Sequence, residues 1–498
     1  MSSFASDPSS NSSLPDAGWR FENSYVELPE AFFARSNPVP FSRPSLYILN
    51  QQLAADLGLD FSQCTEQQLA AIFTGQMIPA GADPIAQAYA GHQFGGFTFL
   101  GDGRAILLGE HRTPDNKLYD IQFKGSGQTV FSRRGDGRAA LGPMLREYIV
   151  SEAMSALGIP TTRSLAVATT GEPVYREKKL RGAVLTRVAA SHIRVGTFQY
   201  IAARKDHENL RRLADYTIAR HYPGLVNSAE KYLAFLYAVA ERQASLIAQW
   251  QSVGFIHGVM NTDNMAISGE TIDYGPCAFM DTYHSDTVFS SIDDYGRYAY
   301  GNQPNIAQWN LARFAETLLP LIHDHLETAI EIATTAIHSI PQTYQRHWLQ
   351  AMGKKIGLAE LESRDVGLIE SLLEWMQHQK LDFTKTFRDL ASEAILTSQV
   401  YQDATFLKWR ENWEAKLAEY GKSRASVSSL MNQVNPVIIP RNHRVEEALA
   451  ACEQRDEVEV LERLLGAVTD PFSDKPEFQA YRDPAPPTQT CYQTFCGT

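Results

Sequence analysis

The order of short strands and long helices along the chain constrains its fold more than any other feature. Residues 91–190 are rich in glycine and in short apolar runs, and the chain beyond about residue 200 has long amphipathic stretches at 229–250, 311–322 and 326–340. Short apolar runs bounded by glycine predict strands, and apolar residues that recur every three or four positions predict helices. This order predicts an α+β fold.

Within residues 91–190 we expect several strands and one helix. Residues 119–124 alternate apolar and polar side chains, as a half-buried strand does. Residues 140–157 have helical spacing and stop at Gly158, a common helix end. Further strands are predicted at 164–169 and 183–188 with a turn at 171–173, and further helices at 45–57 and 65–73.

Two glycine-containing runs are candidate phosphate loops. Gly101-Asp102-Gly103-Arg104 lies between apolar runs at 97–100 and 105–108, which predict a hairpin. Its backbone amides could approach a phosphate. Asp-Gly is also the commonest hairpin turn, so the motif alone does not distinguish these two roles. Gly135-Asp136-Gly137-Arg138 is a second such run, which a plain loop before the helix would also explain.

The whole pattern predicts a bilobal protein-kinase-like fold, in which a small strand-rich N-lobe with one key helix precedes a large helical C-lobe. Fold alone does not establish chemistry. The region 340–435 is interpreted only as helical packing. The expected divisions are a disordered tail (1–17), an N-terminal extension (18–90), the N-lobe (91–195), the C-lobe (196–470) with a metal and catalytic loop at 255–281, and a C-terminal tail (471–498).

Charge and cysteine content exclude several classes of protein. The formal net charge of −12 argues against a nucleic-acid partner. Five cysteines, unevenly spread, form neither a secreted disulfide framework nor a zinc-ligand pattern. The N-terminal stretch lacks the basic and apolar segments of a signal peptide, and no apolar run is long enough to cross a membrane. We therefore expect a cytoplasmic protein without a membrane partner.

Lys124 and Glu147 are candidates for the lysine–glutamate pair that holds phosphates in kinases. Lys124 ends the strand at 119–124, and Glu147 lies on the helix that follows. Kinases place a strand lysine against a helix glutamate in this order. The alternative is an ordinary surface ion pair, or no pair at all.

The strongest motif begins at His257. Small-molecule kinases of the kinase-like superfamily carry the motif H-G-D-x-x-x-x-N. His257, Gly258 and Asn264 match its first, second and last residues. Asp273 opens an Asp-Tyr-Gly triplet that matches the metal-binding triplet of kinases. An amide and a carboxylate oxygen suit Mg²⁺, so Asn264 and Asp273 are predicted metal ligands.

The same motif lacks the usual catalytic base. Val259 occupies the base position and cannot accept a proton. Asp263, next to Asn264, is a carboxylate that could accept the proton instead, given suitable geometry. The site therefore either binds a nucleotide without chemistry or performs a different reaction.

Arg187 and Arg194 favour a different reaction. They lie near the predicted lobe junction, where a kinase binds adenine and ribose. Guanidinium groups bind phosphates bidentately, so phosphates at this end of the cleft would require a reversed nucleotide. The alternative is that both arginines are solvated or paired with acidic residues.

Taken together, these segments resemble the selenoprotein O family of kinase-like AMP transferases. The resemblance runs from about residue 90 to 450 through AGHQFGGFTFLGDGRA, YDIQFKGSG, RRGDGRAALGPMLREYIVSEAM, LTRVAASHIRVGTFQ, HGVMNTDNMAI, DYGP and IPRNHRVEEAL. It implies an inverted ATP, with Asp263 as proton acceptor, Asn264 and Asp273 as metal ligands and Glu147 as support for the lysine. The implied nucleotide contacts are Gly101, Gly103, Arg104, Lys124, Asp136, Gly137, Arg187, Arg194 and Asp273.

One departure concerns the cysteines. The family often has a cysteine or selenocysteine near its C-terminus, and Cys496 matches that place. Some bacterial members also have a cysteine in the loop after the metal-binding aspartate, where this chain has Ser290 and Ser291. A redox-switching disulfide is therefore doubtful, although Cys277 or Cys491 could take the missing place.

The favoured function is transfer of AMP from ATP to Ser, Thr or Tyr hydroxyls of proteins, with Mg²⁺ or alternatively Mn²⁺. Transfer of UMP from UTP is a second expectation, because the mapped contacts mainly address phosphates. Two other functions stay open from sequence. One is a conventional phosphotransferase that uses Asp263 as a displaced base, and the other is an inactive nucleotide-binding pseudokinase scaffold.

Overall fold

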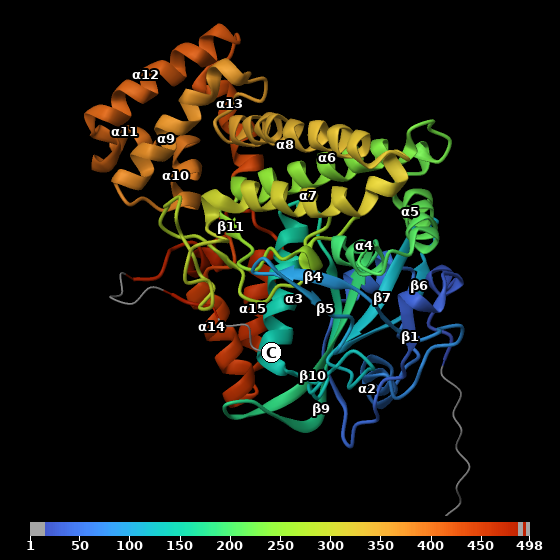
Figure 1. Cartoon of the computed structure of the whole chain (residues 1–498). Helices are drawn as coiled ribbons and strands as arrows, with labels where there is room; N and C mark the ends of the chain where they lie inside the picture. Colours follow the sequence, from blue (N-terminus) through green and yellow to red (C-terminus); the bar gives the residue numbers. More distant parts are fainter. Residues whose placement is uncertain (1–14, 487–491, 495–498) are drawn as a thin grey trace, which may run out of the picture.

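The structure is a computed structural model that describes residues 15–486 and 492–494 (Figure 1). Its strands are β1 (Phe33–Arg35), β2 (Ser45–Leu49), β3 (Ile85–Gln87), β4 (Ala90–Gln93), β5 (Gly96–Phe99), β6 (Ala105–Arg112), β7 (Leu118–Lys124), β8 (Ala139–Ala140), β9 (Arg163–Tyr175), β10 (Lys179–Ala189), β11 (Phe255–Ile256) and β12 (Ala278–Phe279). The large sheet is antiparallel, in the order β1-β3-β6-β7-β10-β9-β2, with β8 beside β10. β4 pairs with β5 and β11 with β12 in two small sheets.

The helices occur along the whole described chain, and most of them follow the last strand of the large sheet. They are α1 (Gln51–Asp56), α2 (Glu66–Thr74), α3 (Leu141–Ala156), α4 (Val195–Ala202), α5 (His207–His221), α6 (Lys231–Ser252), α7 (Gln303–Ile322), α8 (Leu326–Lys355), α9 (Val366–His378), α10 (Phe383–Leu390), α11 (Ala394–Thr397), α12 (Ala404–Glu419), α13 (Arg424–Val434), α14 (Asn442–Ala450) and α15 (Val458–Val468). This combination of helices and an antiparallel sheet confirms the predicted α+β class. Among the described residues, none of these helices is both long and apolar enough to cross a membrane.

The three elements with the clearest sequence patterns are confirmed. α2 begins at a capping box in which Thr65 and Gln68 bond each other's backbone N–H. β7 matches the predicted strand at 119–124, although residues 120–124 are all buried and do not alternate between buried and exposed. α3 ends where Gly158 takes a φ of +76°, a conformation that glycine adopts without strain.

The hairpin predicted around Gly101-Asp102-Gly103-Arg104 is wrong. β5 pairs with β4 and β6 pairs with β7, so the glycine run crosses from the small sheet to the large one. Asp102 anchors this crossing, because its buried carboxylate accepts hydrogen bonds from the backbone N–H of Gln87 (3.1 Å) and the side chain of Gln122 (3.3 Å). A local turn motif could not reveal these distant partners.

Two other boundaries also differ from prediction. The helix predicted at 45–57 is a strand, β2, followed by α1, because Asn50 accepts the N–H of Leu53 (3.0 Å) and starts the helix there. The turn predicted at 171–173 lies inside β9, where Gly171 has a φ of +69° and the pairing with β10 shifts register. The chain reverses at 176–178 instead.

The predicted tail and the predicted N-terminal extension both include residues that pack against the rest of the structure. Residues 1–14 of the predicted tail lie outside the described residues, whereas Ala17 is buried. β1, β2 and β3, from the predicted N-terminal extension, belong to the large sheet.

The helix α3 is enclosed on both sides. It packs on the large sheet through β9 and β10 and on the late helices α14 and α15, which share its apolar cluster (Figure 1). Almost every side chain of α3, including the charged Arg146 and Glu147, is buried. This packing fixes the position of Glu147 against the large sheet.

Candidate active site

A cavity of about 1210 Å³ lies between the large sheet, α3 and the 257–276 segment. All eleven residues predicted to contact nucleotide, metal or the transferred proton line it, as does Glu147. They are Gly101, Gly103, Arg104, Lys124, Asp136, Gly137, Arg187, Arg194, Asp263, Asn264 and Asp273. The fold therefore brings together residues that are up to about 170 positions apart in sequence, from Gly101 to Asp273.

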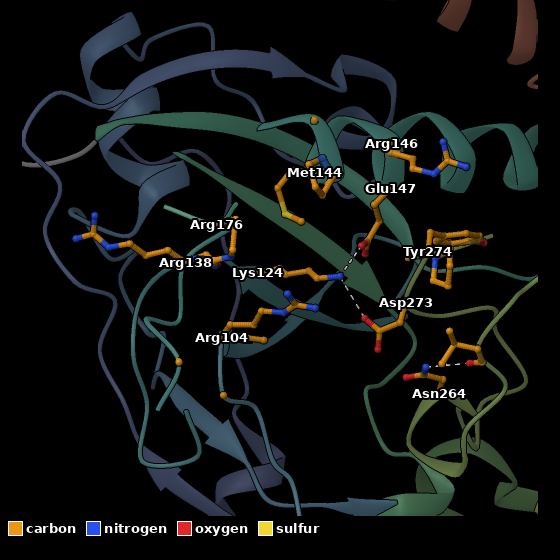
Figure 2. Close-up of a pocket in the computed structure, with 18 of the residues that line it drawn as sticks. Arg104, Lys124, Arg138, Met144, Arg146, Glu147, Arg176, Asn264, Asp273 and Tyr274 are labelled. Carbon is orange, nitrogen blue, oxygen red and sulfur yellow. Dashed lines mark hydrogen bonds and ion pairs between the residues drawn. The ribbon is translucent and has the colours of Figure 1, made fainter. Parts of the chain in front are cut away.

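A buried charge cluster forms the inner end of this cavity. Lys124 Nζ lies 2.7 Å from Glu147 Oε2 and 3.4 Å from Asp273 Oδ1, so it points between the two carboxylates (Figure 2). Lys124 and Glu147 are both buried, and the alternative of a surface ion pair therefore does not apply. Burial and the neighbouring Arg187 lower the pKa of Lys124.

Arg187 and Arg194 converge on the same aspartate. Arg187, on β10, bonds both Glu147 and Asp273. Arg194, the residue before α4, lies 3.0 Å from Asp273 Oδ2 and stacks on Tyr89 with its guanidinium carbon 4.5 Å from the ring centre. Both arginines are buried, both are paired with acid, and both face the cavity. Both arginines therefore form the ion pairs with acidic residues that were predicted as an alternative to phosphate binding, and they form them in the wall of the cavity.

Asp273 is the centre of this cluster. It has a φ of +64°, unusual for a residue other than glycine, which places its carboxylate among the three cations. Burial alone would raise the pKa of Asp273, but Arg187, Lys124 and Arg194 hold it well below its usual range. Glu147 and Asp102, which lies 3.8 Å from Arg194, bring the carboxylates of this cluster to three against three cations. A phosphate ligand at the inner end would therefore meet three cationic side chains that are already paired with acid.

Asp263 lies beside this cluster, because Arg194 also donates to its backbone carbonyl (3.0 Å). Its side chain is buried, and its Oδ1 has no hydrogen-bond partner among the described residues. Burial raises the pKa of Asp263 to about 6, whereas Arg194 opposes the rise. A carboxylate with free acceptor capacity at the cavity wall can take a proton from a bound hydroxyl.

Asn264 and Asp273 present oxygen atoms from two sides of the cavity. The amide nitrogen of Asn264 donates to the carbonyl of Val259 (3.0 Å), which leaves the amide oxygen free to bind (Figure 2). Mg²⁺ commonly takes one or two protein oxygens and completes its shell with substrate phosphates and water. No cluster of three or more His, Cys, Asp or Glu side chains with metal-site spacing occurs in the described part of the chain. The donor set therefore fits a metal that is shared with a phosphate ligand.

The two glycine runs form the outer part of the cavity. Gly101 and Gly103 pack against Phe131, where an added Cβ on Gly101 would lie 2.4 Å from the ring. Asp136, at the exposed rim, is paired with Arg176 (2.9 Å), and Gly137 takes a φ of +66° beside it. The loop between the two runs is bonded to the first of them, because Thr129 Oγ1 donates to the carbonyl of Asp102 (2.6 Å) and Ser132 Oγ donates to that of Gly103.

Sequence reasoning missed several basic residues at this outer end. Besides Arg104, other basic side chains line the cavity, and these were not predicted to contact the nucleotide. The repeated arginines around Gly135-Asp136-Gly137 were visible in the sequence and could have marked the rim as basic. The missed cavity residues with positive side chains are Arg133, Arg134, Arg138, Arg146, Arg176 and Lys178.

The segment near the C-terminus also reaches the cavity. Tyr492 donates to Glu446 (2.6 Å) and accepts from Arg146 (3.1 Å), and Thr494 forms a parallel bridge with Ser290. Cys491 and Cys496 lie outside the described residues, so the predicted match of Cys496 to the family cysteine has no structural account. Cys277 is buried, and burial raises the pKa of its thiol to about 11, so it is a poor nucleophile at neutral pH.

Comparison with known proteins gives consistent matches along nearly the whole length. Residues 17–469 match the family model described as protein adenylyltransferase SelO. A protein nucleotidyltransferase YdiU from Nitrosococcus oceani is 56% identical over 97% of this chain and 98% of its own length. A protein of the same name from Geobacillus kaustophilus is 57% identical over 97% of this chain and 100% of its own length.

Proposed function

This chain belongs to the protein adenylyltransferase SelO family, a family of nucleotidyltransferases, and we propose that it transfers AMP from ATP to Ser, Thr or Tyr hydroxyls of proteins. The observation that carries the proposal is the convergence of Lys124, Arg187 and Arg194 on Asp273 at the inner end of the cavity. Three buried cations at that end attract the β- and γ-phosphates and leave the α-phosphate nearer the cavity mouth. This is the inverted orientation that the family resemblance implies.

The absent kinase base supports the same orientation. Val259 lines the cavity at the position where a kinase has its catalytic aspartate, so a γ-phosphate there would meet no proton acceptor. Asp263 supplies a carboxylate nearby. The antiparallel sheet, the single helix α3 and the helical remainder also support the proposal that the fold is the two-lobed one of protein kinases.

In the proposed reaction the chain positions both partners and manages one proton. Asp263 accepts the proton of the acceptor hydroxyl while its oxygen forms a bond to the α-phosphorus. The bond from that phosphorus to the β-bridging oxygen breaks, and pyrophosphate leaves with the electron pair. Lys124, Arg187 and Arg194 offset the negative charge that develops on the pyrophosphate.

A divalent ion completes the proposed site. The side-chain oxygens of Asn264 and Asp273 would hold Mg²⁺, or Mn²⁺ in its place, together with phosphate oxygens. When bound, the ion adds positive charge beside the phosphates. Since the contacts named above address phosphates rather than a base, we propose that UTP is also a donor.

Parallel incubations with α-³²P-ATP and γ-³²P-ATP test the proposed function. We expect a protein acceptor to gain label from the α position only, and to gain none when EDTA removes the metal. Label from the γ position only would establish a phosphotransferase. The pseudokinase scaffold is the weaker alternative, because the matching family and relatives are named as transferases; absence of label from both positions would nevertheless overturn the proposal.

A further inference from the structure

The β4–β5 hairpin is attached directly to the turn that carries Asp263. The backbone N–H of His92 donates to Thr262 Oγ1 (2.7 Å), and that of Phe94 donates to Asn261 Oδ1 (3.0 Å). Gly91 lies so close that an added Cβ would be 2.2 Å from Asp263 Oδ1. The hairpin therefore cannot move without moving the residue that is proposed to accept the proton.

The hairpin also carries three exposed phenylalanines within six residues. Phe94 at its tip is 40% exposed, and Phe97 and Phe99 on β5 are 42% and 49% exposed. Side chains alternate between the two faces of a strand pair, so Phe97 and Phe99 lie on the face opposite Gly91 and outside the cavity lining. Figure 1 shows the hairpin beside α4, in open view. Exposed apolar side chains gathered in one place mark binding surfaces.

Aromatic neighbours extend this group on both sides. Phe99 packs edge-on against Tyr200 with ring centres 5.7 Å apart. Phe94 packs in the same way against Tyr298, 5.1 Å away, on the loop that follows the Asp-Tyr-Gly triplet. Buried Tyr200 and Tyr298 thus connect the hairpin to α4 and to that loop, and Gln93 of the same hairpin lines the cavity.

Two arginines flank the aromatic rings. Arg204 stacks on Tyr200, and its guanidinium carbon lies 5.7 Å from the ring centre of Phe99. Arg297 stacks on Trp309 at 4.9 Å, beyond the hairpin tip. Within the part of the chain that the structure describes, no carboxylate lies within 4.0 Å of either guanidinium group. In a chain of net charge −12, unpaired arginines beside apolar rings favour an acidic partner.

We propose that Phe94, Phe97, Phe99, Arg204 and Arg297, here called the hairpin surface, bind the acceptor protein next to its reactive hydroxyl. The occupant is a segment of the acceptor with a large apolar side chain and a carboxylate close in sequence to the Ser, Thr or Tyr. The apolar side chain packs on the phenylalanines and the carboxylate pairs with an arginine. This inference rests on the proposed function, because it assigns part of the substrate recognition to the same site.

A peptide library tests this assignment. Each peptide carries one serine with randomised flanking positions, and incorporation of label from α-³²P-ATP is measured for each sequence. We expect the wild-type chain to prefer aromatic or large aliphatic residues and Asp or Glu near the serine. The double variant Phe97→Ala/Phe99→Ala should lose the apolar preference and raise KM for a preferred peptide about ten-fold. Arg204→Ala/Arg297→Ala should lose the acidic preference.

Control measurements separate binding of the acceptor from other effects. Tyr237 on α6 is 42% exposed and lies outside the hairpin surface, so Tyr237→Ala should keep the wild-type preferences. Calorimetric ATP affinity and thermal melting should be unchanged in the phenylalanine variant, because neither phenylalanine lines the cavity. A variant that melts early is replaced by Phe97→Leu/Phe99→Leu, which should weaken the aromatic preference alone.

The outcomes distinguish this proposal from the proposed function. If the wild-type chain labels no peptide and no protein, the proposed function fails. If it labels peptides but shows no flanking preference, or keeps that preference in both double variants, the hairpin surface does not bind the acceptor. If the phenylalanine variant changes only a dimer into a monomer in light scattering, the surface joins two copies of this chain and the proposal is overturned.

Discussion

Arg194 allows the cleanest single-residue test of nucleotide orientation. Its removal leaves Asp273 paired with both Lys124 and Arg187 and costs Asp102 only a long contact of 3.8 Å, whereas removal of Arg187 would take a direct hydrogen bond from buried Glu147. A charge-assisted contact contributes about 1.5–3 kcal/mol, so Arg194→Ala should weaken ATP binding roughly ten-fold or more and leave adenosine binding nearly unchanged.

Calorimetric titration of both ligands measures this difference. Arg181→Ala is a suitable control, because Arg181 pairs with Asp456 on the surface and does not line the cavity. Equal losses of affinity for ATP and adenosine would place Arg194 at the base end of the nucleotide and contradict the inverted orientation.

Asp263 is the residue on which the chemical step should depend most. Asp263→Asn keeps the size of the side chain but removes its ability to accept a proton, so AMP transfer should fall about 10²- to 10⁴-fold. The Kd for ATP should change little, since the buried cations that meet the phosphates remain. Single-turnover transfer of α-³²P label and calorimetry with ATP give the two quantities.

Asp403→Asn provides the matched control for this substitution. Asp403 caps the N-terminus of α12, far from the cavity lining, and asparagine caps helices equally well. A transfer rate in Asp263→Asn within a few-fold of that in Asp403→Asn would show that another group accepts the proton.

The β4–β5 hairpin allows a test at the level of one structural element. In Gly91→Ala the new Cβ would lie 2.2 Å from Asp263 Oδ1, so either the carboxylate or the hairpin must shift. We expect transfer to fall at least about ten-fold, because small displacements of a catalytic group are costly. Stability should fall by about 1–3 kcal/mol, the usual cost of overpacking.

The same hairpin supplies the control for that change. An added Cβ on Gly96 meets nothing closer than the carbonyl of Gln93 at 3.5 Å, which is an ordinary contact. Gly96→Ala should therefore leave both the transfer rate and the urea midpoint near their wild-type values. Similar activity losses in the two variants would mean that the whole hairpin, rather than its contact with Asp263, limits the rate.

Elements with a strong local pattern were predictable from the sequence, and strand pairing was not. α3 and α2 follow from helical spacing with capping residues, and β7 follows from its alternation. β6 pairs with β3 and β7, and Asp102 bonds a residue on each of these two strands, which are distant from each other in sequence. A hairpin was therefore predicted where the chain crosses between two sheets.

The candidate site was also predictable from the sequence only in part. The residue types of the cavity could be identified from motif order and from the family resemblance. Their geometry could not, because Arg187 and Arg194 reach Asp273 only after β10 and α4 have packed against the 257–276 segment. The hairpin surface was missed because exposure cannot be recognised in the run Phe94–Phe99 without its neighbours.

At the scale of the whole molecule, residues distant in sequence return to support the site. α14 and α15 pack on α3, so the C-terminal part of the chain holds the helix that carries Glu147. Helical spacing predicts that such helices have a buried face, but it does not indicate which surface that face will cover. The apolar cluster around α3 is therefore shared by elements from both sides of residue 196.

Glu270 links the chain between β10 and α4 to the 257–276 segment. Its ionisation should make the free energy of unfolding depend on pH. Its carboxylate accepts from the backbone N–H of Ala190 (3.0 Å), between β10 and α4, and from Ser268 Oγ (3.0 Å). Burial raises the pKa of Glu270 from 4.5 to about 7, against the hydrogen bonds from Ser268 and Ala190, which lower it. The folded chain thus holds this proton more tightly than the unfolded chain does.

The sign of the effect follows from that difference. The stabilising contribution of Glu270 is fully present below about pH 4.5, where both states are protonated, and it is lost as the pH rises through about 7. Glu270→Gln keeps an oxygen that can accept from both Ala190 and Ser268 but has no charge to bury. Because the side chain is half-buried, we expect the variant to be about 1–2 kcal/mol more stable than wild type at pH 8 and no more stable at pH 4.5. Urea unfolding at both pH values measures the two differences. A variant that is less stable than wild type at pH 8 would mean that the ionised carboxylate strengthens the link between β10 and the segment that carries Asp263 and Asp273.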